Sequence, residues 1–189
     1  MRSWLDDARA RALHARAHQA ATRRAALRNG ERFLEVAVGG GHTFLPLVLQ
    51  NPDGDNVGVD LDAGALSACR ARLERGGARR YQLEQADARA LPFADERFDL
   101  VLCCYLLDGL DEADQDRALG EFWRLLRPNG RLILTQMARS GLPVYARLIR
   151  DRRPVNVGPR LLAAGFRDVS QIVYKRLGFH SELVRGLKA

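Results

Sequence analysis

The sequence predicts an α/β fold built on a doubly wound, mostly parallel sheet with helices on both faces. Two observations favour this fold. First, short runs rich in apolar and β-branched residues alternate along the chain with helix-compatible segments, which is the pattern of a parallel sheet. Second, the run at 33–38 leads directly into three glycines and then into a helix-compatible segment, as in the cofactor sites of open α/β sheets.

The first 30 residues are predicted to form a cover helix rich in arginine and alanine, ahead of a single domain at 31–189. Residues 1–28 contain no interior proline or glycine, and they carry seven arginines against two aspartates. Leu13, Ala17, Ala20 and Leu27 form a thin apolar stripe suited to docking on the sheet. We interpret the arginines as a solvated face, and we keep a nucleic-acid or anionic membrane surface as the less favoured alternative.

The remaining elements follow in order. Strands are expected near 33–38, 56–60, 80–85, 98–103 and 131–137, and helices near 43–50, 63–75, 111–127 and 159–164. Asp62 is placed to cap the second of these helices, and Gly76-Gly77 to end it. The turn Pro128-Asn129-Gly130 ends the helix at 111–127. Two β-rich runs at 169–177 and 179–187 flank Gly178 and predict a hairpin.

The glycine segment predicts a nucleoside cofactor. Glycine lets the backbone adopt positive φ and lets a ligand approach the main chain closely. The second strand ends in Asp60, about nineteen residues beyond the glycines, where a carboxylate can reach a ribose diol. A dinucleotide fingerprint would need a small residue where Phe44 stands. Glu35 beside the turn disfavours a pyrophosphate and favours a sulfonium or ammonium. A cofactor with a positive centre and no phosphate fits better, and S-adenosylmethionine is one such cofactor.

The sequence resembles the class I S-adenosylmethionine-dependent methyltransferases, in the type 11 branch with ubiquinone and menaquinone methyltransferase-like enzymes. The resemblance covers about 32–139 and the C-terminal hairpin. It rests on four blocks in the family's order, at 34–41, 57–62, 85–101 and 126–134. It implies a Rossmann-like sheet of seven strands completed by one antiparallel strand, with S-adenosylmethionine as cofactor and S-adenosylhomocysteine as product.

The resemblance also implies roles for individual residues. The glycine turn would lie under the methionine part, with Glu35 at its ammonium group. Asp60 would bind the ribose hydroxyls, Leu61 the adenine face, and Asp87 with the N–H of Ala88 the adenine edge. Each acid has a plainer alternative, as a strand-end carboxylate, a helix cap or a turn residue. The expected cofactor-binding residues are Glu35, Ala37, Gly39, Gly40, Gly41, Asp60, Leu61, Asp87, Ala88 and Cys104.

Two departures from the family bear on the site. Relatives usually have glycine where this chain has Ala37. A methyl group there is expected to be tolerated at negative φ and to crowd the cofactor in a left-handed conformation. Relatives also often carry a longer lid in place of the irregular span 140–159, so a more open site is expected here.

The acceptor side is less well defined. Tyr105 and Asp108 follow the strand at 98–103, at the sheet edge where ligands bind, and are candidates to orient the acceptor or take its proton. His42 is a candidate general base. The alternatives are a loop aromatic, a helix cap and a polar residue at a helix start. The segment 103–108 lacks the Asn/Asp-Pro-Pro-aromatic motif of base N-methyltransferases.

Three hypotheses for function remain open. The leading one is methyl transfer to O, N or C of a small, amphiphilic or lipid-like acceptor. The second is an RNA- or tRNA-directed methyltransferase, and the third a non-catalytic binding subunit. A homodimer is compatible with each.

Length and composition limit the classes of protein to which this chain can belong. The 189 residues suit one domain. No apolar run is long enough to span a bilayer, no signal peptide is recognisable, and three cysteines make no disulfide framework, which together predict a cytoplasmic protein. No metal is expected, because His14 and His18 lack a third ligand and Cys103 and Cys104 point to opposite faces of a strand.

Overall fold

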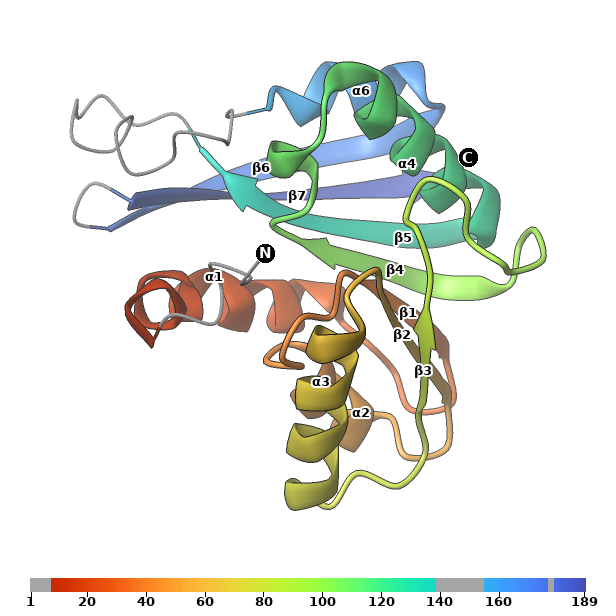
Figure 1. The fold of residues 1–189 in the computed structure, drawn as a ribbon. Coiled ribbons are helices and arrows are strands. Elements are labelled where there is room, and N and C mark those ends of the chain that lie inside the picture. The colour runs from red at the N-terminus through yellow and green to blue at the C-terminus, as the bar shows by residue number, and fades with distance from the viewer. Residues whose placement is uncertain (1–7, 139–154, 177–178) are drawn as a thin grey trace.

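The computed structural model describes residues 8–138, 155–176 and 179–189, with side chains from Arg16 onward except those of Arg176 and Phe179. Its centre is one seven-stranded sheet in the order β3-β2-β1-β4-β5-β7-β6 (Figure 1). Strands β1 to β5 run parallel, and β7 runs antiparallel to both of its neighbours. The predicted fold class is therefore confirmed. The strands are β1 Arg32–Val36, β2 Asp55–Asp60, β3 Gln82–Gln85, β4 Phe98–Cys104, β5 Leu126–Met137, β6 Phe166–Arg176 and β7 Phe179–Lys188.

The predicted helices are present. They are α1 Ala8–Ala25, α2 Phe44–Gln50, α3 Ala63–Arg75, α4 Glu112–Leu125 and α6 Val157–Ala163, with an unpredicted 3₁₀ turn η2 at Leu107–Gly109. Asp62 caps α3 as expected, because its side chain accepts a hydrogen bond from Gly64 N at 2.8 Å. Asp111 caps α4 in the same way, through Asp114 N.

The alternation of side chains along each strand divides the core between the two faces of the sheet. On β1, Leu34 and Val36 join the apolar cluster that contains α4 and α6, whereas Phe33 joins the cluster that contains α1, α2 and α3. Glu35 therefore belongs to the second face. On β4, Cys103 and Cys104 lie in different clusters, which confirms that they point to opposite faces.

The first helix docks on the sheet through its smallest side chains. Ala17, Ala21 and Ala25 are buried, and α1 packs against β4, β5 and β7 (Figure 1). Leu27, just beyond the helix, is also buried, as the predicted apolar stripe requires. Leu13 and His14 lie outside the described side chains, and the arginines at 16, 23 and 24 are exposed.

The start of β5 is the strand boundary that differs most from the prediction. Strand β5 begins at Leu126 rather than at 131, because Leu126 pairs with Phe98 before a register shift at the start of β4. The left-handed Asn129, with φ of 62°, then turns the chain within the strand. Residues 139–154, which hold most of the predicted irregular span, and Gly178 of the hairpin lie outside the described residues. None of the described helices is both long and apolar enough to cross a membrane.

Candidate cofactor and acceptor site

The turn between β1 and α2 has left-handed backbone at alternate positions. The φ angles are 60° at Ala37, 51° at Gly39 and 72° at Gly41. A Cβ on Gly41 would lie 2.7 Å from Cys69 Sγ, so only glycine lets α3 pack against the turn there. Gly41 lines neither of the cavities described below; it shapes the turn from behind.

A cavity of about 460 Å³ lies between this turn and α1. It includes four of the expected cofactor residues on the turn and its strand, and Cys104 at the end of β4. The cavity is lined by His18, Gln19, Thr22, Arg23, Glu35, Ala37, Val38, Gly39, Gly40, His42, Thr43, Pro46 and Cys104. The helix that covers the sheet therefore also forms one wall of this cavity.

Glu35 is the buried acid of this cavity. Its side chain is 2% exposed, and its Oε2 has no hydrogen-bond partner among the described residues. Burial raises the pKa of this carboxyl well above its ordinary value, and the nearby Asp60 raises it further. A buried carboxyl without a partner is costly, so a cation placed in the cavity would satisfy it.

A second, smaller cavity of about 170 Å³ lies beyond the ends of β2 and β3. Ala37 borders both cavities, so they adjoin across the turn. The second cavity is lined by Val36, Ala37, Asp60, Leu61, Ala86, Asp87, Ala88, Arg89, Leu106 and Leu110. It thus brings together the residues that were expected to bind ribose and adenine.

Asp60 ties the glycine turn to β2. Its Oδ2 accepts a hydrogen bond from Gly39 N at 2.9 Å, and its Oδ1 accepts one from Asp62 N at 3.0 Å. Each carboxylate oxygen keeps a further lone pair for a ligand hydroxyl. Leu61, at the rim of the same cavity, is 63% exposed, so its apolar side chain is available to cover a planar ring.

Arg89 holds Asp87. The Arg89 side chain donates to both oxygens of Asp87, with Nη2 at 2.6 Å from Oδ2, and Nη1 reaches Asp114 at 2.6 Å. These hydrogen bonds hold the pKa of Asp87 below its usual range. Sequence reasoning missed Arg89, which lies two residues after a motif acid and gives no periodic signal.

Residues 33–130 match the family model described as a methyltransferase domain, which is about half of the chain. The chain belongs to this methyltransferase family. The resemblance to class I S-adenosylmethionine-dependent methyltransferases of the ubiquinone and menaquinone branch is thereby confirmed.

Two curated relatives have names that belong to this ubiquinone and menaquinone branch. The chain is 34% identical over 126 residues to the ubiquinone/menaquinone biosynthesis C-methyltransferase UbiE of Ectopseudomonas mendocina, covering 65% of this chain and 48% of that one. It is 38% identical over 106 residues to the demethylmenaquinone methyltransferase of Thermus thermophilus, covering 56% of this chain and 47% of that one. The chain thus spans about half the length of the curated relatives it matches.

Solved structures agree with the fold. The magnesium protoporphyrin IX methyltransferase of Synechocystis superposes with a TM-score of 0.79 at 14% identity, covering 95% of this chain and 85% of that one. The [4+2]-cyclase SpnF superposes with a TM-score of 0.76 at 21% identity, covering 92% and 80%. At these identities the likeness concerns the methyltransferase fold alone.

Ala37 stands where the family usually has glycine, and the structure shows which backbone conformation it adopts. With φ of 60°, Ala37 is left-handed, so the condition under which its methyl group was expected to be tolerated is not met. The conformation costs an L-residue about 1–2 kcal/mol. Its side chain also stands at the point where the two cavities meet.

Ala37→Gly is therefore expected to raise both stability and cofactor affinity. Removing the strain should increase the free energy of unfolding by about 0.5–1 kcal/mol, net of the entropy that glycine adds to the unfolded chain. Urea unfolding and calorimetric titration with S-adenosylmethionine measure the two effects. Ala86→Gly is the control, since Ala86 lines the second cavity without positive φ and should only lose stability. An equal loss of stability in Ala37→Gly and in Ala86→Gly would contradict backbone strain at Ala37.

His42 lines the first cavity, but its Nε2 lies 2.8 Å from Arg72 Nη2. Because a guanidinium only donates, that nitrogen of His42 accepts the hydrogen bond. Arg72 Nε also donates to Gly40 O at 2.5 Å. Arg72, which sequence reasoning missed, thus links α3 to the glycine turn through both residues.

Tyr105 and Asp108, the other catalytic candidates, line neither cavity. Tyr105 is 2% exposed, and its hydroxyl lies 2.8 Å from Ser181 Oγ on β7. Asp108 is also buried, within η2. Their predicted contact with the acceptor stays untested.

His18, on α1, also lines the first cavity. Its Nδ1 is 2.8 Å from Thr43 Oγ1, and its ring meets the Tyr105 ring edge-on at 5.5 Å between centroids. Burial, together with His42, lowers the pKa of His18 to about 4, so its ring is uncharged at neutral pH. No group of metal-ligand residues occurs within the described part of the chain.

Proposed function

We propose that this chain binds S-adenosylmethionine across the glycine turn and methylates a small hydroxylated aromatic acceptor of the quinol type. The observation that carries the cofactor part is the buried carboxyl of Glu35, whose Oε2 lacks a hydrogen-bond partner among the described residues and which faces a cavity that adjoins the one around Asp60. The printed names of the curated relatives, a C-methyltransferase of quinone biosynthesis and a demethylmenaquinone methyltransferase, support the acceptor class.

The residues present fit this cofactor. Glu35 would bind its ammonium group, Asp60 its ribose hydroxyls and Leu61 the face of its adenine. Asp87, held by Arg89, and the N–H of Ala88 would bind the adenine edge. When bound, S-adenosylmethionine supplies a methyl carbon already activated by the sulfonium, so positioning of the acceptor can provide much of the acceleration.

The acceptor would enter between α1 and the glycine turn. His18 is uncharged and hydrogen-bonded to Thr43, so it is suited to orient an acceptor hydroxyl. The exposed guanidinium of Arg23 lines the same cavity and would favour an oxygen that gains negative charge. Tyr105 would act as a positioning residue through its edge contact with the His18 ring. His42 would hold the turn through Arg72 rather than serve as a base.

Incubation with methyl-labelled S-adenosylmethionine and a reduced demethylated naphthoquinol tests the proposal. We expect labelled quinol and an equal amount of S-adenosylhomocysteine, both lost in Asp60→Ala. Cofactor binding without transfer to any acceptor would point to the non-catalytic alternative. Label in a tRNA pool with none in the quinol would point to the RNA-directed alternative.

His18→Gln is expected to lower kcat/KM for the quinol about tenfold, because the variant loses one hydrogen bond near the reacting groups. Its affinity for S-adenosylmethionine should stay within about twofold, because the cofactor is assigned to other residues of the cavity. Steady-state kinetics and calorimetry measure the two quantities. His180→Gln on β7 is the matched control. An equal loss in both quantities would show that His18 only supports the fold.

A further inference from the structure

A third cavity, of about 300 Å³, lies at the opposite edge of the sheet from the glycine turn. The start of β5 and the segment that links α1 to β1 form its walls, together with Asp99 near the start of β4 and Arg185 near the end of β7. Arg28, Arg127, Arg131 and Arg185 line it together with Glu31 and Asp99. Arg127 and Arg131 both lie on β5, whereas Arg28 and Arg185 are far from them in sequence, and the packing of α1, β5 and β7 brings the three segments to one place.

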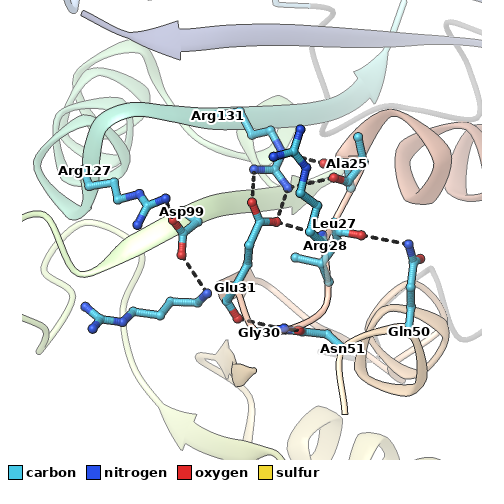
Figure 2. A network of polar contacts seen from close by, with 12 residues as sticks. Ala25, Leu27, Arg28, Gly30, Glu31, Gln50, Asn51, Asp99, Arg127 and Arg131 are labelled. Carbon is cyan, nitrogen blue, oxygen red and sulfur yellow. Dashed lines mark hydrogen bonds and ion pairs between the residues drawn. The ribbon is translucent and has the colours of Figure 1, made fainter. Parts of the chain in front are cut away.

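Two of these guanidinium groups are occupied by the protein itself (Figure 2). Arg131 Nη2 lies 2.6 Å from Glu31 Oε2, and Arg131 Nε donates to Ala25 O at 2.5 Å at the end of α1. Arg127 forms an ion pair with Asp99, whose Oδ2 also accepts from Arg32 N at 2.8 Å. Both carboxylates of the cavity are therefore engaged.

The other two guanidinium groups are not balanced. Within the described residues, the side chains of Arg28 and Arg185 have no carboxylate partner. Arg28 donates a hydrogen bond to Glu31 through its backbone N, at 2.9 Å from Oε2, and its guanidinium charge acts on the same carboxylate without forming an ion pair. Four guanidinium groups thus face two carboxylates around one cavity, and two positive charges are left over.

We propose that this cavity binds a doubly charged oxyanion, namely the phosphate monoester group of a small molecule. Guanidinium groups present paired donors that match the oxygens of a phosphate, and such charge-assisted hydrogen bonds are the strong ones. A dianion between Arg28 and Arg185 would neutralise the two remaining charges. It would also link the segment after α1 to β7. This proposal does not depend on the proposed methyl transfer.

Titration of the full chain with inorganic phosphate and with glycerol 3-phosphate, at constant ionic strength, tests the site. We expect a saturable rise in Tm and calorimetric binding of one anion. The double variant Arg28→Gln/Arg185→Gln should bind at least about tenfold more weakly, with unchanged affinity for S-adenosylmethionine. Arg70→Gln/Arg79→Gln, two exposed arginines elsewhere, should bind as the wild type does.

Three outcomes would overturn the proposal. One is a Tm that responds to phosphate no more than to sodium chloride of equal ionic strength. Another is equal affinity in the wild type and the Arg28/Arg185 variant. The third is co-sedimentation with phosphatidic acid vesicles without binding of either soluble phosphate, which would assign the charges to a lipid surface instead.

Discussion

Asp60→Ala is expected to weaken binding of S-adenosylmethionine at least about 100-fold. The carboxylate is proposed to accept two hydrogen bonds from the ribose, each worth about 1.5–3 kcal/mol for a charged acceptor. Asp60 also holds Gly39 N at 2.9 Å, so its loss frees the turn beneath the methionine part. Together these losses amount to about 3 kcal/mol or more. Because about 1.4 kcal/mol corresponds to a tenfold change in Kd, the Kd should rise at least about 100-fold. Isothermal titration calorimetry measures the change directly.

Asp62→Ala is the matched control for this variant. Asp62 lies two residues further along, lines neither cavity and caps α3 through Gly64 N. Its loss should cost about 1 kcal/mol of stability while leaving the Kd for S-adenosylmethionine within about threefold. If the two variants bound the cofactor equally well, the assignment of the ribose to Asp60 would be wrong.

Glu35→Gln is expected to remove a pH dependence of stability and to weaken cofactor binding. The pKa of Glu35 is raised in the folded state, so above the unfolded value of about 4.5 the unfolded chain binds fewer protons than the native one. Stability therefore falls as pH rises from about 4.5 towards the folded pKa. Glutamine does not titrate, so the variant should lose this slope and be more stable than the wild type at pH 8. Thermal unfolding between pH 5 and pH 8 measures the difference.

The same variant tests the ammonium contact. Binding of a cation favours the charged form of Glu35, so the wild type should release a proton when S-adenosylmethionine binds at a pH below the raised pKa of this carboxyl. Calorimetry in buffers of different ionisation enthalpy should detect that release in the wild type and not in Glu35→Gln, whose affinity should fall about tenfold or more. Glu74→Gln, on the exposed surface of α3, is the control. A proton release that persists in Glu35→Gln would exclude this role.

The residues of the proposed cofactor half of the site could be named from the sequence because their signals are local. A strand, a glycine turn and a strand-end acid each occupy a few adjacent residues, and the parallel sheet brings Glu35 and Asp60 to one edge. The acceptor half could not be predicted in this way. His18 and Tyr105 come from segments far apart in sequence, and the edge contact between their rings depends on how α1 crosses the sheet.

The sequence by itself determined the order of strands and helices, the glycine turn and the family, because periodicity and turn residues act over short distances along the chain. Tertiary structure alone decided which face α1 covers, and thereby placed His18 inside the cavity. It brought the Tyr105 hydroxyl to Ser181 on β7. It also fixed Ala37 in a left-handed conformation and gathered the arginines of the third cavity. Periodicity shows that a helix has a buried face, but only packing shows which distant residues that face meets.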